Sequence, residues 1–217
     1  MINIALDGPA GSGKSTIAKA ISEKLGILYL DTGALYRACA LKAYILGVDC
    51  KNEAEVKKFI SDADISVGYD GNGQITYLDG KDVSDKIRKN EISMRASDIS
   101  AHKCVRDKLL SLQREIAAKN DCVLDGRDIG TFVLPDAAYK FFITASIEVR
   151  AKRRYNELLN RGQSVDFEEL KNTISKRDYN DAHREIAPLK QADDAVLIDT
   201  SDMTISEVIE KVMSYIG

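Results

Sequence analysis

The residues from Gly8 to Ser15 read G-P-A-G-S-G-K-S, and they follow the apolar stretch Ile2–Leu6. Their order fits G-x-x-x-x-G-K-[ST], the phosphate-binding loop of strand–loop–helix nucleotide-binding proteins. Glycines let the backbone curl until its N–H groups point at phosphate oxygens, and the following helix adds its positive N-terminal end. Lys14 would bring a cation to the β- and γ-phosphates, and the Ser15 hydroxyl would ligate Mg²⁺. The pattern predicts a nucleoside triphosphate site, the alternative being a glycine-rich turn that matches by accident.

Two further polar segments follow predicted strands. Asp31–Arg37 reads D-T-G-A-L-Y-R, and Leu124–Thr131 reads L-D-G-R-D-I-G-T. Ligands of open α/β sheets dock where the strands end. We therefore expect Arg37, Arg127 and Asp128 to lie at that edge of the sheet.

Each of these residues also has a plain structural interpretation. Asp128 could cap a helix beside a turn, whereas its functional interpretation is a carboxylate near the acceptor's sugar or phosphate that holds arginines in place. Arg37 and Arg127 could be surface arginines. Tyr36 could be an aromatic packed on a helix face, or it could stack on a substrate or contact its sugar.

Arginines are concentrated in one late segment of the chain. They are Arg150, Arg153, Arg154, Arg161, Arg177 and Arg184. A charge run is usually a solvated helix face. Here Lys152 adds a further positive charge, and only Glu148 and Glu157 lie nearby, so the like charges repel one another. A mobile lid over about residues 150–164, closing on a triphosphate, would explain the cluster.

The number of these cations suits one reaction. Transfer of a phosphoryl group from a triphosphate to a nucleoside monophosphate brings about six negative charges together. Mg²⁺ cancels two, so about four protein cations must converge, and charge neutralisation with positioning supplies nearly all the catalysis. The available cations are Lys14, Arg37, Arg127 and some of Arg150, Arg153 and Arg154. A hydrolytic switch would need a water-positioning group and guanine-reading motifs, and the sequence shows no such set.

The elements that must position these residues alternate between strand and helix patterns. The predicted strands are Ile2–Leu6, Ile27–Leu30, Cys122–Leu124, Tyr139–Ile143 and Ala195–Ile198. The predicted helices follow the phosphate loop as far as Gly26, span Gly33–Leu46, run from Asn52 to Ile60, occupy about Asn90–Ala118 as two helices, and begin near Ser146, Asp166 and Thr204. The alternation predicts an α/β fold, a parallel sheet with helices on both faces.

One segment departs from this alternation. Ile65–Val83 contains I-S-V-G-Y, the turn D-G-N-G and then Q-I-T-Y-L-D-G, the pattern of a β-hairpin. We expect a single domain over residues 1–217, with a small antiparallel lobe inserted at about residues 63–92.

Composition excludes several classes of protein. The 217 residues carry a net charge of −3, which lacks the basic excess of a nucleic-acid-binding protein. No apolar run approaches the 18 residues of a membrane span, and the first strand leaves no room for a signal peptide. The four cysteines show no C-x-x-C spacing, so we expect thiols without zinc. These features predict a cytoplasmic protein, and we expect a monomer.

Four motifs together resemble the bacterial cytidylate kinases. They are G-P-A-G-S-G-K-S-T, D-T-G-A-L-Y-R, D-G-R-D-I-G-T and R-D-Y-N-D-A-H-R, and the resemblance extends over essentially the whole chain. It implies a P-loop kinase whose hairpin lobe helps to bind the monophosphate. It also implies transfer of the γ-phosphoryl group of ATP to CMP or dCMP with Mg²⁺. Thr32 stands where serine is commoner, and it keeps the hydroxyl.

The resemblance also assigns site residues. For ATP they are Gly8, Pro9, Ala10, Gly11, Ser12, Gly13, Lys14, Ser15 and Thr16, with Ser15 on Mg²⁺ and Asp125 as a weaker candidate near it. For catalysis they are Lys14, Asp128, Arg153 and Arg154. For CMP they are Thr32, Tyr36, Arg37, Ser97, Arg106, Arg127, Asp128, Arg177, Asp181 and Arg184. The spacing of the last three also suits a plain salt bridge within one helix, and Ser97 and Arg106 rest on the resemblance alone.

Two other functions stay open at this point. One is a kinase for another small acceptor, such as UMP. The other is a regulatory or assembly protein that binds ATP and changes shape without an acceptor. Release of ADP that depends on the acceptor separates a kinase from such a switch.

Overall fold

The computed structural model describes residues 1–71, 73–160 and 162–217, so Asn72 of the hairpin turn and Arg161 of the predicted lid lie outside the described residues. Internal contacts divide the chain into two compact units. The sheet unit comprises Ile2–Leu28 and Cys122–Gly217, and the hairpin unit comprises Met1 and Tyr29–Asp121. The predicted single domain and the limits of its inserted lobe stay predictions.

The sheet unit is built on parallel strands. β1 (Asn3–Asp7) lies between β6 (Cys122–Gly126) and β7 (Tyr139–Thr144), and β8 (Val196–Asp199) follows β7. With β2 (Leu28–Asp31), the order of the five-stranded sheet is β2-β6-β1-β7-β8. The centres of these strands read as unbroken apolar runs because both faces of a parallel sheet are covered. The predicted parallel α/β architecture is confirmed.

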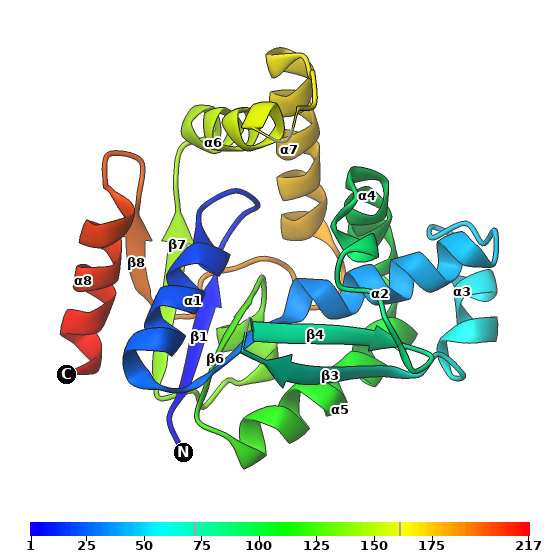
Figure 1. Ribbon diagram of the computed structural model, residues 1–217, viewed down its shortest axis with the longest axis horizontal. Coiled ribbons are helices and arrows are strands. Elements are labelled where there is room, and N and C mark those ends of the chain that lie inside the picture. The colour runs from blue at the N-terminus through cyan, green and yellow to red at the C-terminus, as the bar shows by residue number, and fades with distance from the viewer. Residues whose placement is uncertain (72, 161) are drawn as a thin grey trace. The chain divides into compact units, whose positions relative to one another are not determined.

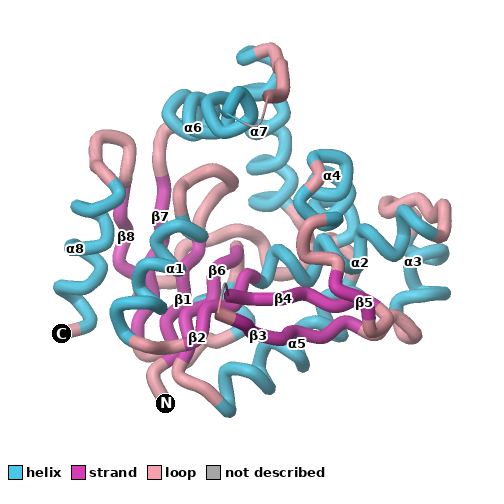
Figure 2. Tube along the Cα trace, viewed as in Figure 1, coloured by secondary structure: helices cyan, strands magenta, loops and turns pink. Residues whose placement is uncertain are grey.

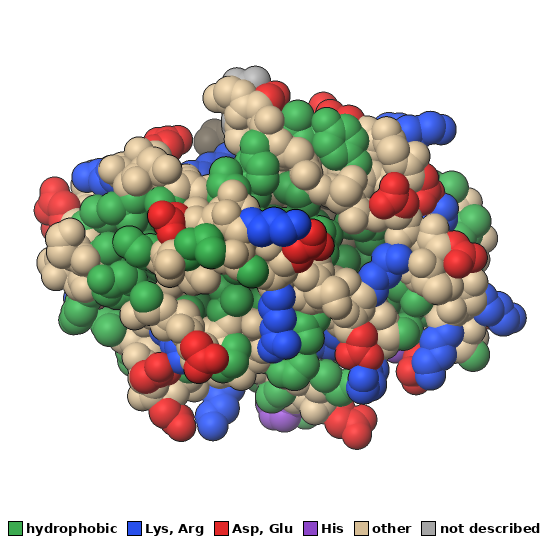
Figure 3. All heavy atoms as spheres, turned by 90° about the horizontal axis from the view of Figure 1, so that it is seen from below, with side chains coloured by type: hydrophobic (Ala, Val, Ile, Leu, Met, Phe, Trp, Pro, Cys, Tyr) green, Lys and Arg blue, Asp and Glu red, His purple; other side chains and the backbone are tan. Residues whose placement is uncertain are grey.

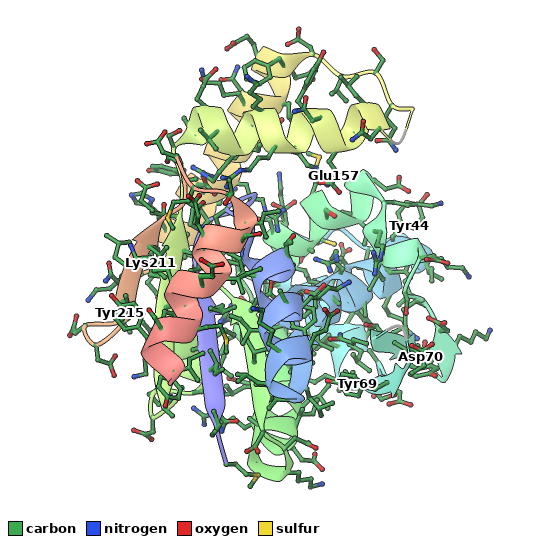
Figure 4. The ribbon with its side chains drawn as sticks, turned by 60° about the vertical axis from the view of Figure 1, so that its left-hand side comes forward. Tyr44, Tyr69, Asp70, Glu157, Lys211 and Tyr215 are labelled. Atoms are coloured by element: carbon green, nitrogen blue, oxygen red, sulfur yellow. The ribbon has the colours of Figure 1, made fainter. Side chains whose placement is uncertain are left out.

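Four helices belong to the sheet unit: α1 (Lys14–Leu25), α6 (Ile147–Asn160), α7 (Phe167–His183) and α8 (Ile205–Ile216). Figure 1 shows α6 beside α7, while α8 packs against β7 and α1. Lys211 and Tyr215 lie one turn apart on α8 (Figure 4), and the Tyr215 ring meets Phe141 of β7 edge-on at 6.0 Å. The predicted start of α8 near Thr204 is confirmed, and it carries a capping box in which the Thr204 hydroxyl accepts the N–H of Glu207.

The hairpin unit combines four helices with a small antiparallel sheet. The helices are α2 (Thr32–Ile45), α3 (Glu53–Ile60), α4 (Asn90–Ile99) and α5 (Lys103–Lys119), and a short 3₁₀ turn spans Lys86–Arg88. The strands are β3 (Ile65–Asp70), β4 (Gly73–Leu78) and β5 (Lys81–Asp82), in that order across the sheet. Figure 2 shows β3 and β4 as the paired strands of the predicted hairpin, which is confirmed.

Apolar packing holds the hairpin unit together. Its core draws on all four helices and on the hairpin, through residues such as Leu35, Val56, Leu78, Ile92 and Leu109. The predicted start of α3 is also confirmed, because the Asn52 side chain accepts the N–H groups of Ala54 and Glu55. No helix in the described part of the chain is long and apolar enough to cross a membrane. On the face drawn in Figure 3, Lys and Arg side chains are interspersed with Asp and Glu.

Candidate active site

The loop between β1 and α1 has the tight backbone that its glycines predict. Gly8, Gly11 and Gly13 all have φ in the left-handed half, at 145°, 77° and 93°. A Cβ atom on Gly8 would lie 2.0 Å from the carbonyl oxygen of Ile143, so no side chain fits there. The loop therefore lies directly against β7, and its last glycine leads into α1.

Lys14 is held inside this loop. Its Nζ donates to the carbonyl oxygen of Pro9 at 2.7 Å and contacts the Ser12 hydroxyl at 3.2 Å, and the residue is only 5% exposed. Burial lowers the pKa of Lys14 well below its usual range, and the positive charge of Arg127 acts in the same direction. A cation held away from water at this point is suited to an incoming anion.

Two oxygen groups meet at the start of α1. The Ser15 hydroxyl donates to the carboxylate of Asp125 at 2.7 Å. Ser15 lies in the first turn of α1 and Asp125 near the end of β6, so the fold brings together two motifs 110 residues apart. Hydroxyl and carboxylate oxygens are the donors that Mg²⁺ prefers, so this pair fits the predicted metal.

Two ion pairs join the segment after β6 to α7. Arg127 Nε donates to Asp181 at 2.9 Å, and Arg184 Nη2 donates to Asp128 at 3.0 Å. In three of the four residues the side chain is 6–7% exposed, and that of Arg127 is 19% exposed. The spacing alone left open a plain salt bridge within one helix. The pairs seen here link α7 to a different segment, as a shared site would require.

The charges of these pairs shift the pKa values of Asp181 and Arg127. Burial would raise the pKa of Asp181, but the nearby Arg127, Arg177 and Arg184 lower it below its usual range. Burial would likewise lower the pKa of Arg127, but Asp181 raises it. Both groups are therefore charged at neutral pH, and Arg177 contributes to the same positive field.

The arginines of α6 are bound within the sheet unit. Arg150 forms an ion pair with Asp178 of α7 and donates to the carbonyl oxygen of Ala10 in the phosphate loop at 3.0 Å. Arg153 donates to the hydroxyl and the carbonyl oxygen of Thr200 at 3.0 and 2.7 Å. Arg154 pairs with Glu157 at 2.8 Å. Each arginine thus has an acceptor in this structure, and the predicted roles of Arg153 and Arg154 at the transferring phosphate stay predictions.

Two carboxylates of the sheet unit have contacts that the sequence did not predict: Asp178, which lies within R-D-Y-N-D-A-H-R but received no role, and Asp7, which lies outside the motifs. Asp178 accepts the N–H of Ala10 at 3.3 Å, so it holds both the loop and Arg150. Asp7 accepts the N–H groups of Ile129 and Gly130 at 2.8 and 2.7 Å. A signal existed for Asp7, because an aspartate that ends an apolar strand just before a phosphate loop is charged and buried. No local pattern identifies its partners.

The hairpin unit holds the other predicted site residues. Arg37 pairs with Asp31 at 2.7 Å, and Asp31 also caps α2 by accepting the N–H of Ala34. Buried Thr32 lies beside it as the first residue of α2. The guanidinium of Arg106 lies 5.6 Å from the centre of the Tyr36 ring, so Tyr36 has the packing contact of its plain interpretation.

Some buried polar atoms of this unit have no hydrogen-bond partner among the described residues. The hydroxyl of Ser97 and Nε of Arg37 are among them. A buried polar atom without a partner is uncommon, because it loses its hydrogen bonds to water and no protein hydrogen bond replaces them. Both residues belong to the predicted acceptor site, which fits a hydroxyl and an N–H group that a ligand would engage.

A parallel sheet whose first strand enters a lysine-bearing phosphate loop, with arginine–carboxylate pairs beyond a neighbouring strand, is the architecture of a P-loop phosphotransferase. The gluconokinase of Sinorhizobium meliloti shares the fold, with a TM-score of 0.51 at 14% identity over 98% of this chain and 90% of that one. An uncharacterized protein from Eubacterium ventriosum gives a TM-score of 0.55 at 15% identity, over 99% of this chain and 97% of that one.

Sequence comparison narrows the class. The sequence model of cytidylate kinase matches residues 4–217, so the chain belongs to the cytidylate kinase family and is a kinase. A cytidylate kinase of Caldicellulosiruptor saccharolyticus is 47% identical over 212 residues, covering 98% of this chain and 94% of that one. One of Bacillus cereus is 45% identical over 216 residues, covering 100% and 96%. The predicted resemblance is confirmed.

Proposed function

We propose that this kinase transfers the γ-phosphoryl group of ATP to CMP and dCMP, giving ADP and CDP or dCDP. The observation that carries the proposal is the double ion pair between the segment after β6 and α7. It joins Arg127 to Asp181 and Arg184 to Asp128, so the D-G-R-D and R-D-Y-N-D-A-H-R motifs form one buried, charged site. The names of the relatives support the acceptor.

ATP binds through the loop from Gly8 to Thr16. Its backbone N–H groups and the N-terminus of α1 receive the phosphates, and Lys14 exchanges its contacts with Pro9 and Ser12 for phosphate oxygens. Negative charge spreads over the transferred group in the transition state, and a buried cation stabilises it more strongly than water would.

Mg²⁺ would be held by Ser15 and Asp125, whose oxygens are already neighbours. When bound, it neutralises charge on the β- and γ-phosphates. The chain's own contribution is to keep the hydroxyl and the carboxylate together at the start of α1.

The proposal assigns CMP-binding residues in each unit separately. In the sheet unit Arg127 contacts the acceptor phosphate, Arg177 belongs to the same set, Asp128 holds Arg184, and Asp181 holds Arg127. In the hairpin unit the proposal includes Thr32, Tyr36, Arg37, Ser97 and Arg106. The partnerless hydroxyl of Ser97 supports that assignment.

Arg184 gives a chemical reason for preferring cytosine. Cytosine presents acceptors at N3 and O2, whereas uracil presents a donor at N3. An arginine only donates, so Arg184 facing this edge would oppose the N3–H group of uracil. A buried mismatch of this kind costs about 1–3 kcal/mol, or roughly 10- to 100-fold in kcat/KM.

We also propose that the protein acts in the cytoplasm. The four cysteines are thiols, the state kept in a reducing compartment such as the cytoplasm. We expect the chain to act as a monomer, which sedimentation with and without nucleotides tests.

One coupled assay tests the function. ADP release is measured with ATP and Mg²⁺ in the presence of CMP, dCMP, UMP, AMP or no acceptor. We expect turnover with CMP and dCMP, at least 10-fold lower kcat/KM with UMP, and a negligible rate without an acceptor. Preference for UMP or AMP would replace the proposed acceptor. Equal release with and without a monophosphate would indicate a nucleotide-driven switch.

A further inference from the structure

The segment that carries Arg127 and Asp128 ends in a single helical turn. This turn, Ile129–Val133, has the wide π geometry and begins directly after Asp128. The first N–H groups of any helical turn lack acceptors within the turn. An aspartate at the preceding position is the residue type that usually supplies one. Asp128 stands at that position and makes no side-chain capping bond.

The missing cap comes from another strand. Asp7, the last residue of β1, directs one carboxylate oxygen to the N–H of Ile129 at 2.8 Å and the other to the N–H of Gly130 at 2.7 Å. Asp7 lies opposite Gly126 in the parallel register of β1 and β6 and is only 4% exposed. The two N–H groups that begin the turn are therefore satisfied by a residue more than 120 positions away in the chain.

Gly130 lies directly beside this contact. A Cβ atom on Gly130 would lie 3.4 Å from a carboxylate oxygen of Asp7, which is ordinary van der Waals contact, and 3.2 Å from the flexible side chain of Lys140. The first residues of the turn are therefore packed against the Asp7 carboxylate.

This arrangement decides what Asp128 does. Because Asp7 caps the turn, the carboxylate of Asp128 points to Arg184 and forms the 3.0 Å ion pair. We propose that Asp7 is a positioning residue: by capping the turn from β1, it fixes the segment that carries Arg127 and Asp128 and leaves the Asp128 carboxylate to orient Arg184. The effect on catalysis rests on the proposed function, in which Arg184 binds CMP.

The charged form of Asp7 carries an energetic penalty. Burial raises its pKa from 3.8 to about 6, even though the two N–H groups favour the charged form. The negative Asp128 raises the pKa further, and the positive Lys14 lowers it. A buried carboxylate that weakens the fold at neutral pH is better explained by its capping contact than by stability.

Asp7→Asn is the nearly isosteric test. The amide oxygen still accepts one N–H, but the NH₂ group meets the other donor. We expect amide hydrogen exchange in Ile129–Val133 to quicken at least 10-fold, while β7 exchanges as before. We expect kcat/KM for CMP to fall on the order of 10-fold or more, as when one buried polar group loses its partner, with ATP affinity changed by less than about 3-fold.

A double-mutant cycle with Asp128→Asn separates positioning from general damage. If Asp7 acts through Asp128, its substitution should change kcat/KM by less than about 2-fold in that background. Ile4→Val, a conservative substitution at a buried position of the same strand, is the control for lost stability. It should not reproduce the fall in kcat/KM for CMP that we expect of Asp7→Asn. Should Asp7→Asn not fold, Asp7→Ser serves instead, since it removes the carboxylate that accepts both N–H groups and should produce the same pattern.

Unchanged exchange in Ile129–Val133, or fully additive effects in the cycle, would overturn the inference. The exchange measurement needs no substrate, so it judges Asp7 even if the wild-type enzyme proves not to phosphorylate CMP. In that case the proposed function fails, and the capping role is still decided.

Discussion

The two units hold their candidate site residues in different ways. In the sheet unit the charged side chains already bind one another, as in the pairs Arg127–Asp181 and Arg184–Asp128. In the hairpin unit Arg37 pairs with Asp31, but its Nε and the hydroxyl of Ser97 are buried without a hydrogen-bond partner among the described residues. The sheet unit is thus electrostatically preorganised, whereas in our proposal the hairpin unit is completed by its ligand.

Burial and neighbouring charge are balanced differently from group to group. In the sheet unit, neighbouring charges outweigh burial at Asp181 and Arg127, so both stay charged, whereas burial dominates at Asp7 and Lys14. In the hairpin unit burial dominates at Cys39, whose pKa rises to about 12, leaving an inert thiol in the apolar core. The charge that is fully offset by partners is therefore that of the arginine–carboxylate pairs.

The sharpest challenge to this comparison is Lys14→Ala. This substitution removes the cation that oxygen atoms of the loop hold in place. We expect kcat to fall on the order of 10²-fold or more, because the charge acts mainly in the transition state. Steady-state kinetics with CMP as the acceptor measures the fall in kcat. We expect the affinity for CMP to change little. Lys171→Ala on α7, which removes a lysine outside the loop, is the control and should keep its activity. A Lys14→Ala enzyme with most of its kcat would contradict the phosphate-loop assignment.

The pH dependence of stability tests the buried charge of Asp7. Its folded pKa of about 6 lies above the unfolded value of 3.8. The stabilisation from the protonated form is therefore complete below pH 3.8 and is lost as the pH rises to about 6. Two pKa units correspond to about 3 kcal/mol.

The measurement is urea unfolding of the wild type and Asp7→Asn at pH 4, 5, 6 and 7. Asp7→Asn cannot ionise at this position, so its stability relative to the wild type should rise by up to about 3 kcal/mol across this range. A difference that stays constant with pH would show that the carboxylate is not strained by burial.

Arg184→Met probes base recognition in the sheet unit. We expect kcat/KM for CMP to fall strongly and that for UMP to change less, so that the CMP-to-UMP ratio narrows by roughly 10- to 100-fold. The exposed Arg88 in the hairpin unit, changed to Met, is the matched control. An unaltered ratio in Arg184→Met would assign base recognition elsewhere, with Ser97 and Arg106 as the next candidates.

Ser97→Ala gives the smallest expected effect and the clearest contrast between protein and ligand contacts. Because its hydroxyl has no partner in the described part of the chain, its removal should change the free energy of unfolding by less than about 0.5 kcal/mol. The kcat/KM for CMP should still fall by about 3- to 10-fold, the effect of one hydrogen bond.

Ser100→Ala is the matched control for this pair of measurements. The Ser100 hydroxyl donates to the carbonyl oxygen of Ser97 at 2.8 Å, so its removal should cost about 1 kcal/mol of stability with little change in kcat/KM. The opposite pattern, in which Ser97→Ala destabilises the fold and spares catalysis, would remove Ser97 from the proposed CMP site.

Local patterns predicted most of the fold. The glycine-bent loop between β1 and α1, the hairpin and the caps at Asn52 and Thr204 are confirmed because each depends on residues only a few positions apart. The contacts of Asp7 were not predicted because they join positions more than 120 residues apart. Their geometry arises only when β1 and β6 pair. The family resemblance assigned Arg127 and Asp181 to the acceptor site but did not predict that they pair, and no spacing rule contains this contact.

The α6 arginines show the limit of charge counting. Like charges in sequence predicted mutual repulsion, whereas the structure supplies Arg150 with Asp178 and Arg153 with Thr200, both distant in the chain. The sequence pattern shows the like-charged residues that are neighbours on α6, but it does not show the acceptors that other elements supply to them. Hydrogen exchange of α6 with and without an ATP analogue tests the predicted lid, and equal protection in both states would contradict it.

The central claim is that CMP receives the phosphoryl group of ATP. ³¹P NMR of a mixture of ATP, CMP, Mg²⁺ and the wild-type enzyme follows every phosphorus atom directly. Our account predicts that the resonances of CDP and ADP grow together in equal amounts while those of CMP and ATP decline. Growth of inorganic phosphate and ADP with the CMP resonance unchanged would contradict it.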